Sequence, residues 1–459
     1  MRQNPKEALA LRVVDTWLDY QSRFTDLPGF QVCLRKKGQI VFSKAYGVAN
    51  LTTQRPLKTT DFFHIASHSK TFTSCAILQL VEQGKLALHH FILDYLPELK
   101  KHKDKRFKKI TIRDLLSNRS GIFRDGLDCE FWNLQKPFPS REQLIQEVLA
   151  SDLIFGPNEQ TKYSNMAYSL LGLILENVLG MSYQKAMESL VFKKLKGVKL
   201  LTDYEEAHRD RFAEGHSRTL WEGKRLTFEH APARGLASAT GFCGNAEDTS
   251  LFFDTFLCGK GLVTKETQQE ILALNWAVKN EPETRYGLGL VFDHFSDMDL
   301  VGHKGGYPGF STYTAHWMGT EYVISVLVNA NEYLPVRIAR SLLQILQKIK
   351  TTFMKEEAET ALLGGPFMDK WGTSLCVLTK KKGLCFMIDT WAPCGSVSVL
   401  TSKDGEAYMC DTQSGFYSPG EKITFAKDKD GTLLSMKWSG SLSPLEDGFR
   451  EDLQAMVLA

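Results

Sequence analysis

Ser67-His68-Ser69-Lys70 is the stretch that decides the fold of this 459-residue chain. Phe62–Ala66 before it predicts an extended segment, whereas Thr71–Val81 after it carries apolar residues at helical spacing. Ser67 should therefore open a helix, and the Lys70 amine, three residues on, should reach the Ser67 hydroxyl. A neutral lysine beside a serine can act as its general base, and the electropositive amino end of a helix suits an oxyanion. Taken alone, the tetrapeptide is more often a helix cap followed by a surface lysine.

Two later segments change that interpretation. The run from Phe155 to Gly172 contains Tyr163-Ser164-Asn165, and Val301–Ser311 contains His303-Lys304-Gly305-Gly306. With Ser67–Lys70 they resemble, in the same order and at plausible spacing, the three motifs of the serine β-lactamase and penicillin-binding-protein superfamily. The closer resemblance is to its class C-like branch, which includes β-lactamases, esterases, D-aminopeptidases and transesterases. Three shorter segments also resemble sequence landmarks of this superfamily: Ile110–Gly121, Ala233–Ser238 and Tyr286–Gly289. The resemblance runs from about residue 28 to about residue 350.

The resemblance implies roles for the residues of the first two motifs. Ser67 would be the nucleophile, and Lys70 would accept its proton or keep Tyr163 deprotonated. Tyrosine has an ordinary pKa of about 10, so it needs a nearby cation to act as a base. Tyr163 would assist the attack and then protonate the leaving group, and Asn165 would position Lys70 and the substrate amide. The alternative for Tyr163 and Asn165 is a plain turn before the helix that follows.

The third motif departs from β-lactamases at His303. β-Lactamases and many penicillin-binding proteins usually have a lysine there, which meets the substrate carboxylate, whereas histidine is common in the peptidase- and esterase-like relatives. A neutral imidazole binds a carboxylate less well near pH 7, so we expect no efficient β-lactam hydrolysis; a structural histidine is the alternative. Gly305 and Gly306 are expected at a strand edge that approaches the substrate closely. The resemblance places the oxyanion hole at the N–H groups of Ser67 and Gly306.

The order of the expected elements predicts an α/β sheet domain with an inserted all-α region, which is also the fold of the superfamily. We expect this hydrolase domain over residues 1–350, with its helical subdomain at about 85–240. The predicted strands form an early hairpin and a late group, followed by a long amphipathic helix: 30–35, 39–46, 286–292, 300–302, 312–317, 322–329 and the helix 335–350.

The last hundred residues differ in character. After a polar linker at 351–360, residues 361–459 show seven or eight short alternating runs separated by turns, which predicts a small antiparallel β-barrel. The tail resembles the lipocalin-like barrel that several peptidase- and esterase-like relatives carry at this place. Such a barrel could bind a ligand, form an oligomer interface or shape access to the active site. We expect Trp371, Trp391 and Trp438 in its core.

Composition excludes several other classes. Hydrophobic content of 43%, charged content of 24% and a net charge of +3 are ordinary for a globular protein and predict neither nucleic-acid nor membrane binding. No segment is apolar over the ~18 residues that a membrane span needs. The amphipathic start lacks a signal-peptide core, so a cytoplasmic protein is expected if Met1 is the native start.

The nine cysteines include no C-x-x-C pair and fit no zinc pattern, so we expect reduced, mostly buried thiols. The chain also lacks a phosphate-cradling glycine loop and a dinucleotide fingerprint. The sequence therefore predicts no metal and no cofactor.

The motifs together predict a serine hydrolase that forms an acyl-enzyme on Ser67 and cleaves amide bonds, possibly beside D-residues, or ester bonds. An acyltransferase or transesterase with the same acyl-enzyme is the alternative, and a β-lactamase or a non-catalytic scaffold is a weaker one. The expected partner is a small-molecule or peptide substrate, with a homo-oligomer through the C-terminal barrel as a further possibility.

Overall fold

The computed structural model describes residues 4–220, 222–369, 372–388, 397–402, 405, 407–410, 419–438 and 441–458. Its contacts divide the chain into two compact units, Leu27–Val336 and the pair of segments Met1–Asp26 and Arg337–Ala459. The boundaries expected at residues 350 and 361 stay a prediction. None of the described helices combines the length and the apolar character that a membrane span requires.

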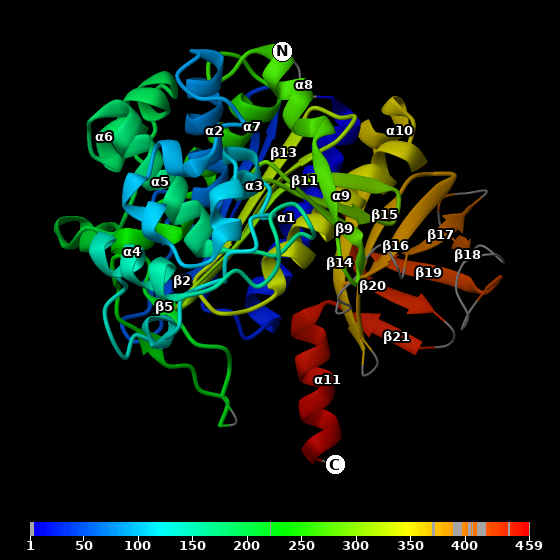
Figure 1. The fold of residues 1–459 in the computed structure, drawn as a ribbon. Coiled ribbons are helices and arrows are strands. Elements are labelled where there is room, and N and C mark those ends of the chain that lie inside the picture. The colour runs from blue at the N-terminus through cyan, green and yellow to red at the C-terminus, as the bar shows by residue number, and fades with distance from the viewer. Residues whose placement is uncertain are drawn as a thin grey trace. The chain divides into compact units, whose positions relative to one another are not determined.

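An antiparallel sheet of nine described strands is the frame of the unit Leu27–Val336 (Figure 1). In sheet order the strands are β3 (Arg55–Pro56), β2 (Gln39–Asn50), β1 (Gly29–Lys36), β13 (Tyr322–Val328), β12 (Phe310–Trp317), β11 (Met298–Tyr307), β10 (Val291–Phe295), β9 (Glu281–Gly287) and β8 (Asn275–Val278). Because β1 pairs with β13, the early hairpin and the late strands join into one sheet.

The strand expected at 286–292 is in fact two strands. β9 ends at Gly287 and β10 begins at Val291, and between them Gly289 takes a φ of +80°. That left-handed backbone is accessible to glycine without strain, and it allows the chain to reverse there. The apolar run hid the turn because Leu288 and Leu290 are buried in the core.

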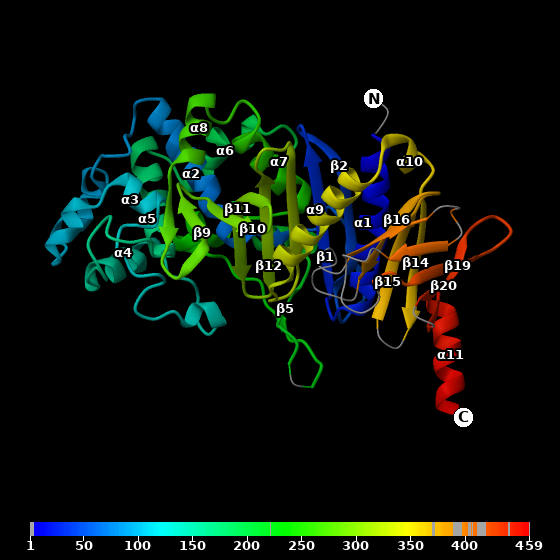
Figure 2. The ribbon, with the colours of Figure 1, turned by 90° about the vertical axis from the view of Figure 1, so that its right-hand side faces the viewer.

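The inserted region of this unit is helical, as expected. Its helices are α2 (Ser69–Glu82), α3 (Ile112–Leu116), α4 (Arg141–Ala150), α5 (Asn165–Leu179) and α6 (Tyr183–Leu190), followed by α7 (Ala246–Leu257) and α8 (Lys265–Ala273). Figures 1 and 2 show α3 to α6 gathered on one side of the sheet, while α7 packs on β1, β12 and β13. Side-chain caps set the starts of α4 and α5, through Ser140 and Ser164 respectively.

Short elements connect these helices. They are the 3-10 turns at Ala66–His68, Ile92–Asp94, Pro97–Lys101, Lys105–Lys109, Glu130–Asn133, Phe192–Lys194, Glu206–Arg211 and Arg234–Leu236, a π-helical turn at Ala237–Gly241, and the strand pairs β4 (Phe63–His64) with β7 (Cys243–Gly244) and β5 (Gly215–His216) with β6 (Thr227–Phe228).

The other unit contains a nearly closed antiparallel barrel of eight described strands. They are β14 (Leu362–Asp369), β15 (Gly372–Leu378), β16 (Lys382–Met387), β17 (Val397–Thr401), β18 (Ala407–Cys410), β19 (Lys422–Lys427), β20 (Leu433–Trp438) and β21 (Ser441–Pro444). The bridge between Phe367 and Leu445 brings the first strand against the end of the last. Trp438 packs half-buried against the barrel core, whereas Trp371 and Trp391 lie outside the described residues.

Among the described residues, four helices belong to the same unit as the barrel: α1 (Pro5–Phe24), most of α9 (Leu334–Thr352), α10 (Lys355–Glu359) and α11 (Glu446–Leu458). The N-terminal helix is tied to the barrel by side chains, since the Tyr20 hydroxyl donates to Thr373 Oγ1 over 2.9 Å and Gln21 donates to the Ile388 carbonyl over 2.8 Å. The segment expected as a linker, 351–360, is largely helical, because it contains the last residues of α9 and the whole of α10.

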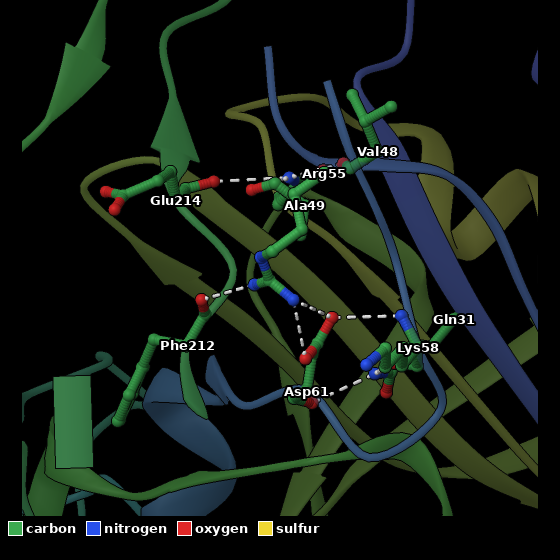
Figure 3. Close-up of polar contacts among 9 residues, drawn as sticks. Gln31, Val48, Ala49, Arg55, Lys58, Asp61, Phe212 and Glu214 are labelled. Atoms are coloured by element: carbon green, nitrogen blue, oxygen red, sulfur yellow. Dashed lines mark hydrogen bonds and ion pairs between the residues drawn. The ribbon is translucent and has the colours of Figure 1, made fainter. Parts of the chain in front are cut away.

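A polar cluster fixes the chain that leads to Ser67 (Figure 3). The Arg55 guanidinium donates to both carboxylate oxygens of Asp61 at 3.0 Å and to the Phe212 carbonyl at 2.8 Å. The Gln31 amide donates to the carbonyls of Lys58 and Asp61 at 2.7 and 2.9 Å. These bonds tie β1 and β3 to the segment that enters the 3-10 turn at Ala66–His68.

We expect the Asp61→Ala substitution to lower the free energy of unfolding by about 1–3 kcal/mol, because it removes the carboxylate that pairs with Arg55 and accepts from the Lys58 backbone N–H. Urea denaturation of the full chain measures this effect. The matched control is Glu321→Ala, which removes an ion pair whose side chains are 67% and 51% exposed and should change stability by no more than ~0.5 kcal/mol. Equal effects of the two substitutions would contradict the anchoring role.

Candidate active site

Ser67 sits in the 3-10 turn Ala66–His68, one turn ahead of α2, and not in the helix itself. Ala66 has a φ of +52°, a left-handed conformation that non-glycine residues seldom adopt. His68 helps to hold this turn, since its Nδ1 lies 2.8 Å from the Ile65 carbonyl. The strained turn leaves the Ser67 side chain half-exposed while its neighbours are buried.

The Lys70 amine is fully buried beside Ser67. Its Nζ lies 2.6 Å from Asn165 Oδ1, 2.7 Å from the Ala239 carbonyl oxygen and 3.2 Å from Ser67 Oγ. Burial holds the pKa of Lys70 well below its ordinary value. In a neutral amine, the two oxygens that can only accept would occupy both N–H groups. The remaining lone pair would then face the Ser67 hydroxyl, which can donate to it.

Tyr163 completes the surroundings of these two residues. Its side chain hydrogen bonds to Ser67, and burial raises its pKa above the ordinary value. The Lys70 Nζ lies 4.6 Å from the centroid of the Tyr163 ring, so the nitrogen faces the ring. The tyrosine therefore presents a protonated hydroxyl to Ser67 in the resting site.

Asn165 is the first residue of α5, and its position is fixed by backbone and side chain. The N–H groups of Asn165 and Met166 donate to the Arg124 carbonyl over 2.9 and 3.1 Å. The Asn165 side-chain Nδ2 donates to Asp125 Oδ1. Asp125 was not a sequence candidate; it follows the Ile110–Gly121 echo by four residues.

The third motif lies on β11, whose second half has a free edge. β10 pairs with β11 only as far as Gly302, whereas β12 pairs with it through Tyr307. In the described part of the chain, this edge of β11 is therefore unpaired beyond Gly302, and its residues 303–306 line the pocket. Gly305 packs tightly, because a Cβ there would lie 2.5 Å from the Ile65 carbonyl oxygen, while a Cβ on Gly306 would meet no atom within 4 Å.

His303 is buried and neutral in this strand. Its Nδ1 lies 2.7 Å from the Lys304 carbonyl oxygen, which can only accept, so Nδ1 carries the proton and Nε2 is an acceptor. Nε2 lies 3.4 Å from the Tyr286 hydroxyl. Burial lowers the pKa of His303 well below its ordinary value. The neighbouring Lys304 is paired with Asp293 at 3.1 Å.

A pocket of about 710 Å³ brings the motif residues together. Its lining includes six of the seven sequence candidates, namely Ser67, Tyr163, Asn165, His303, Gly305 and Gly306, and Lys70 lies just behind Ser67. Sequence reasoning missed the roles of Asp125, Asn118 and Arg124 in this lining and that of the Ala239 carbonyl beneath it. The described residues contain no group of three or more histidine, cysteine, aspartate or glutamate side chains that could hold a metal ion.

Three other motif residues lie away from the reacting atoms. Ser69 is buried and donates to the Ala66 carbonyl over 2.5 Å, and His68 is buried with a pKa lowered by burial to about 4. Arg234 donates to the Phe138 carbonyl over 3.0 Å and is not part of the pocket lining. His68 and Ser69 thus pack the turn.

The two glycines should respond differently to substitution. Gly305→Ala forces a methyl group against the Ile65 carbonyl and the Thr312 hydroxyl, and should destabilise the fold by about 1–3 kcal/mol. Gly306→Ala should leave the melting temperature within about 2 °C of wild type. Thermal denaturation followed by circular dichroism measures both. The opposite order would contradict the tight contact between β11 and the turn at Ser67.

His303 should not titrate in the ordinary range, because its pKa is lowered by burial. Long-range ¹H–¹⁵N spectra between pH 5 and 8 should show a protonated Nδ1 and an unprotonated Nε2 throughout. His294 is an internal control, since it is exposed and Asp299 raises its pKa, so it should gain a proton over this range. The His303→Gln spectrum assigns the signal, and a midpoint near pH 6.5 for His303 would contradict the buried tautomer.

Comparison with known proteins identifies the family and the fold. A model of the family described as Beta-lactamase matches residues 17–347. Among curated proteins, Protein flp of Staphylococcus aureus (strain COL) is 26% identical over 327 residues, which are 70% of this chain and 64% of that protein. This chain therefore spans less than two thirds of the length of that relative.

Two solved structures share the fold. The octameric penicillin-binding protein homologue from Pyrococcus abyssi has a TM-score of 0.66 at 20% identity, and the match covers 94% of this chain and 99% of that one. The D-amino acid amidase from Ochrobactrum anthropi SV3 has a TM-score of 0.63 at 18% identity, with 74% and 99% covered. Since the family model matches well over half of the sequence, this chain belongs to the Beta-lactamase family.

Proposed function

We propose that this chain is a serine hydrolase that forms an acyl-enzyme on Ser67 and cleaves amide or ester bonds. The observation that carries the proposal is the buried Lys70 amine, 3.2 Å from Ser67 Oγ, with two oxygen acceptors at 2.6 and 2.7 Å. That arrangement suits a neutral base whose lone pair faces the nucleophile.

The first half-reaction uses groups that already touch Ser67. Lys70 Nζ takes the hydroxyl proton while Oγ bonds to the substrate carbonyl carbon, and the C=O electron pair moves onto oxygen. The N–H groups of Ser67 and Gly306 would stabilise that oxyanion. When the tetrahedral intermediate collapses, the amine or alcohol leaves with the Tyr163 hydroxyl proton, and the Lys70 ammonium returns a proton to Tyr163.

The second half-reaction releases the acid. Water gives a proton to Lys70 as its oxygen attacks the acyl carbon, and Ser67 Oγ leaves with a proton from the same relay of Lys70 and Tyr163. One hydroxyl and one proton are thus added across the original bond. The enzyme returns to its starting protonation state.

The surroundings of His303 favour a substrate without a carboxylate at that position. Nε2 of His303 can only accept, and the Lys304 ammonium is paired with Asp293. A substrate amide or hydroxyl group can donate to Nε2, whereas a carboxylate cannot. The free edge of β11 over residues 303–307 suits an extended, peptide-like chain. D-Amino acid amides are good test compounds because one structural neighbour is a D-amino acid amidase.

An acyltransferase is the second candidate, because the pocket of about 710 Å³ has room for an acceptor alcohol or amine beside the acyl group. It shares the first half-reaction, and product analysis with added acceptors separates the two. The octameric state of the Pyrococcus abyssi protein, whose match extends over 94% of this chain, makes self-association through the barrel a further part of the proposal.

The test is a turnover assay on D- and L-amino acid amides and p-nitrophenyl esters. We expect Ser67→Ala to abolish turnover of every active substrate, and Lys70→Arg to lower kcat by about 100- to 10,000-fold, because a guanidinium cannot accept the proton. Ser311→Ala is the matched control, since Ser311 lines the same pocket and should keep activity within ~3-fold. Unchanged turnover in the Ser67→Ala protein would refute the proposal.

A further inference from the structure

Asp125 forms the link behind Asn165, at the edge of the pocket. Its Oδ1 accepts from Asn165 Nδ2, and its Oδ2 forms an ion pair with Arg124 Nε at 3.0 Å. The Asp125 side chain is 13% exposed, while that of Arg124 is 65% exposed. Asn165 in turn accepts from the Lys70 amine at 2.6 Å. A continuous chain of hydrogen bonds therefore joins the pocket surface to the base beside Ser67.

These contacts fix which way the Asn165 amide points. A carboxylate can only accept, so Asp125 requires the NH₂ end of the amide. The carbonyl end is then left for Lys70. If the amide flipped, its NH₂ would face Lys70 and could donate to the lone pair of the neutral amine. That bond would compete with the Ser67 hydroxyl for the same lone pair.

The charge of Asp125 acts on Lys70 as well. The carboxylate raises the pKa of Lys70 and Arg124 lowers it, although burial is the larger influence and lowers it. The other titratable groups that face Lys70 are neutral: the rings of Tyr163 and Tyr168 lie 4.6 and 5.7 Å from Nζ, and His303 is held neutral by burial. Asp125 and Arg124 are thus the charged pair that acts on this amine.

We propose that Asp125 is a positioning residue, which holds the Asn165 amide with its carbonyl towards Lys70 and places a carboxylate, paired with Arg124, behind the amine. This inference rests on the proposed function for its kinetic consequence, but the orientation of the amide and the charge at Lys70 exist without turnover. The protein can therefore be tested at both levels.

Kinetics test the positioning role. Asp125→Ala should lower kcat by roughly 10- to 100-fold with KM nearly unchanged, since it misplaces the base and leaves the pocket open. In the Asn165→Ala protein, Asp125→Ala should lower kcat by less than about 2-fold, because the amide that Asp125 positions is already absent. Asp128→Asn, in the same loop and paired with Lys136 on the surface, should leave kcat unchanged. If kcat of the double variant fell by the product of the two single losses, the positioning role of Asp125 would be refuted.

The pH profile tests the charge. Without the carboxylate, Lys70 loses its proton at lower pH, so the acid limb of kcat/KM should move to lower pH in Asp125→Asn. Arg124→Gln should move it to higher pH, because a repelling cation is removed. Asp128→Asn should not move it. An acid limb that stays in place in Asp125→Asn would overturn the electrostatic part.

Nuclear magnetic resonance separates this inference from the proposed function. In protein labelled with ¹³C at the lysine Cε, the Lys70 signal is the one lost in Lys70→Met, and its titration midpoint should fall in Asp125→Asn. If the Lys70 midpoint shifts but turnover does not depend on Ser67, the proposed function is refuted and the role of Asp125 is supported. An unshifted midpoint in an active, folded Asp125→Asn protein would sink the inference alone.

Discussion

Burial of the Lys70 amine is the constraint on which the site depends. An amine removed from water is unfavourable unless its polar atoms find partners, and here the partners come from three separate elements. Ser67 lies on the 3-10 turn, Asn165 begins α5, and Ala239 belongs to the π-helical turn. Each element must be in register for the amine to be satisfied. The same burial lowers the pKa of Lys70. The packing that satisfies the amine in the fold is therefore also what favours its neutral form.

The remaining parts of the unit serve this geometry. The cluster of Arg55, Asp61 and Gln31 anchors the segment that enters the turn at Ser67. On the opposite wall, β11 presses Gly305 against the Ile65 carbonyl, so the strand and the turn share one tight contact. That contact keeps the backbone of Gly306 close to Ser67 without a side chain between them. The neutral His303 then gives this wall of the pocket an acceptor, its Nε2.

Much of this site could be predicted from the sequence because its signals are local. The spacing of Ser67 and Lys70 depends on one helical turn, and the motifs around Tyr163 and His303 are short strings that resemble those of a known superfamily. The alternating runs after residue 361 likewise predicted the barrel. In these cases a few neighbouring residues determine the structure, and the prediction and the structure agree.

What the sequence could not supply depends on contacts between distant segments. Asp125 matters because α5 begins beside it, 40 residues later in the chain, and Ala239 contributes only a carbonyl oxygen, which no residue type reveals. The position of Ser67 ahead of α2 follows from the left-handed backbone of Ala66. An alanine in the sequence does not predict that conformation. The break between β9 and β10 was hidden because its turn carries two buried leucines.

The central claim is that a neutral Lys70 makes Ser67 a nucleophile that forms covalent acyl-type adducts. Intact-mass spectrometry after incubation with a fluorophosphonate, and separately with a penicillin, tests it most directly on the wild type and the Ser67→Ala variant. The account predicts one fluorophosphonate adduct that requires Ser67, and no lasting penicilloyl adduct. The absence of any adduct on the wild type, or the same adduct on Ser67→Ala, would contradict it.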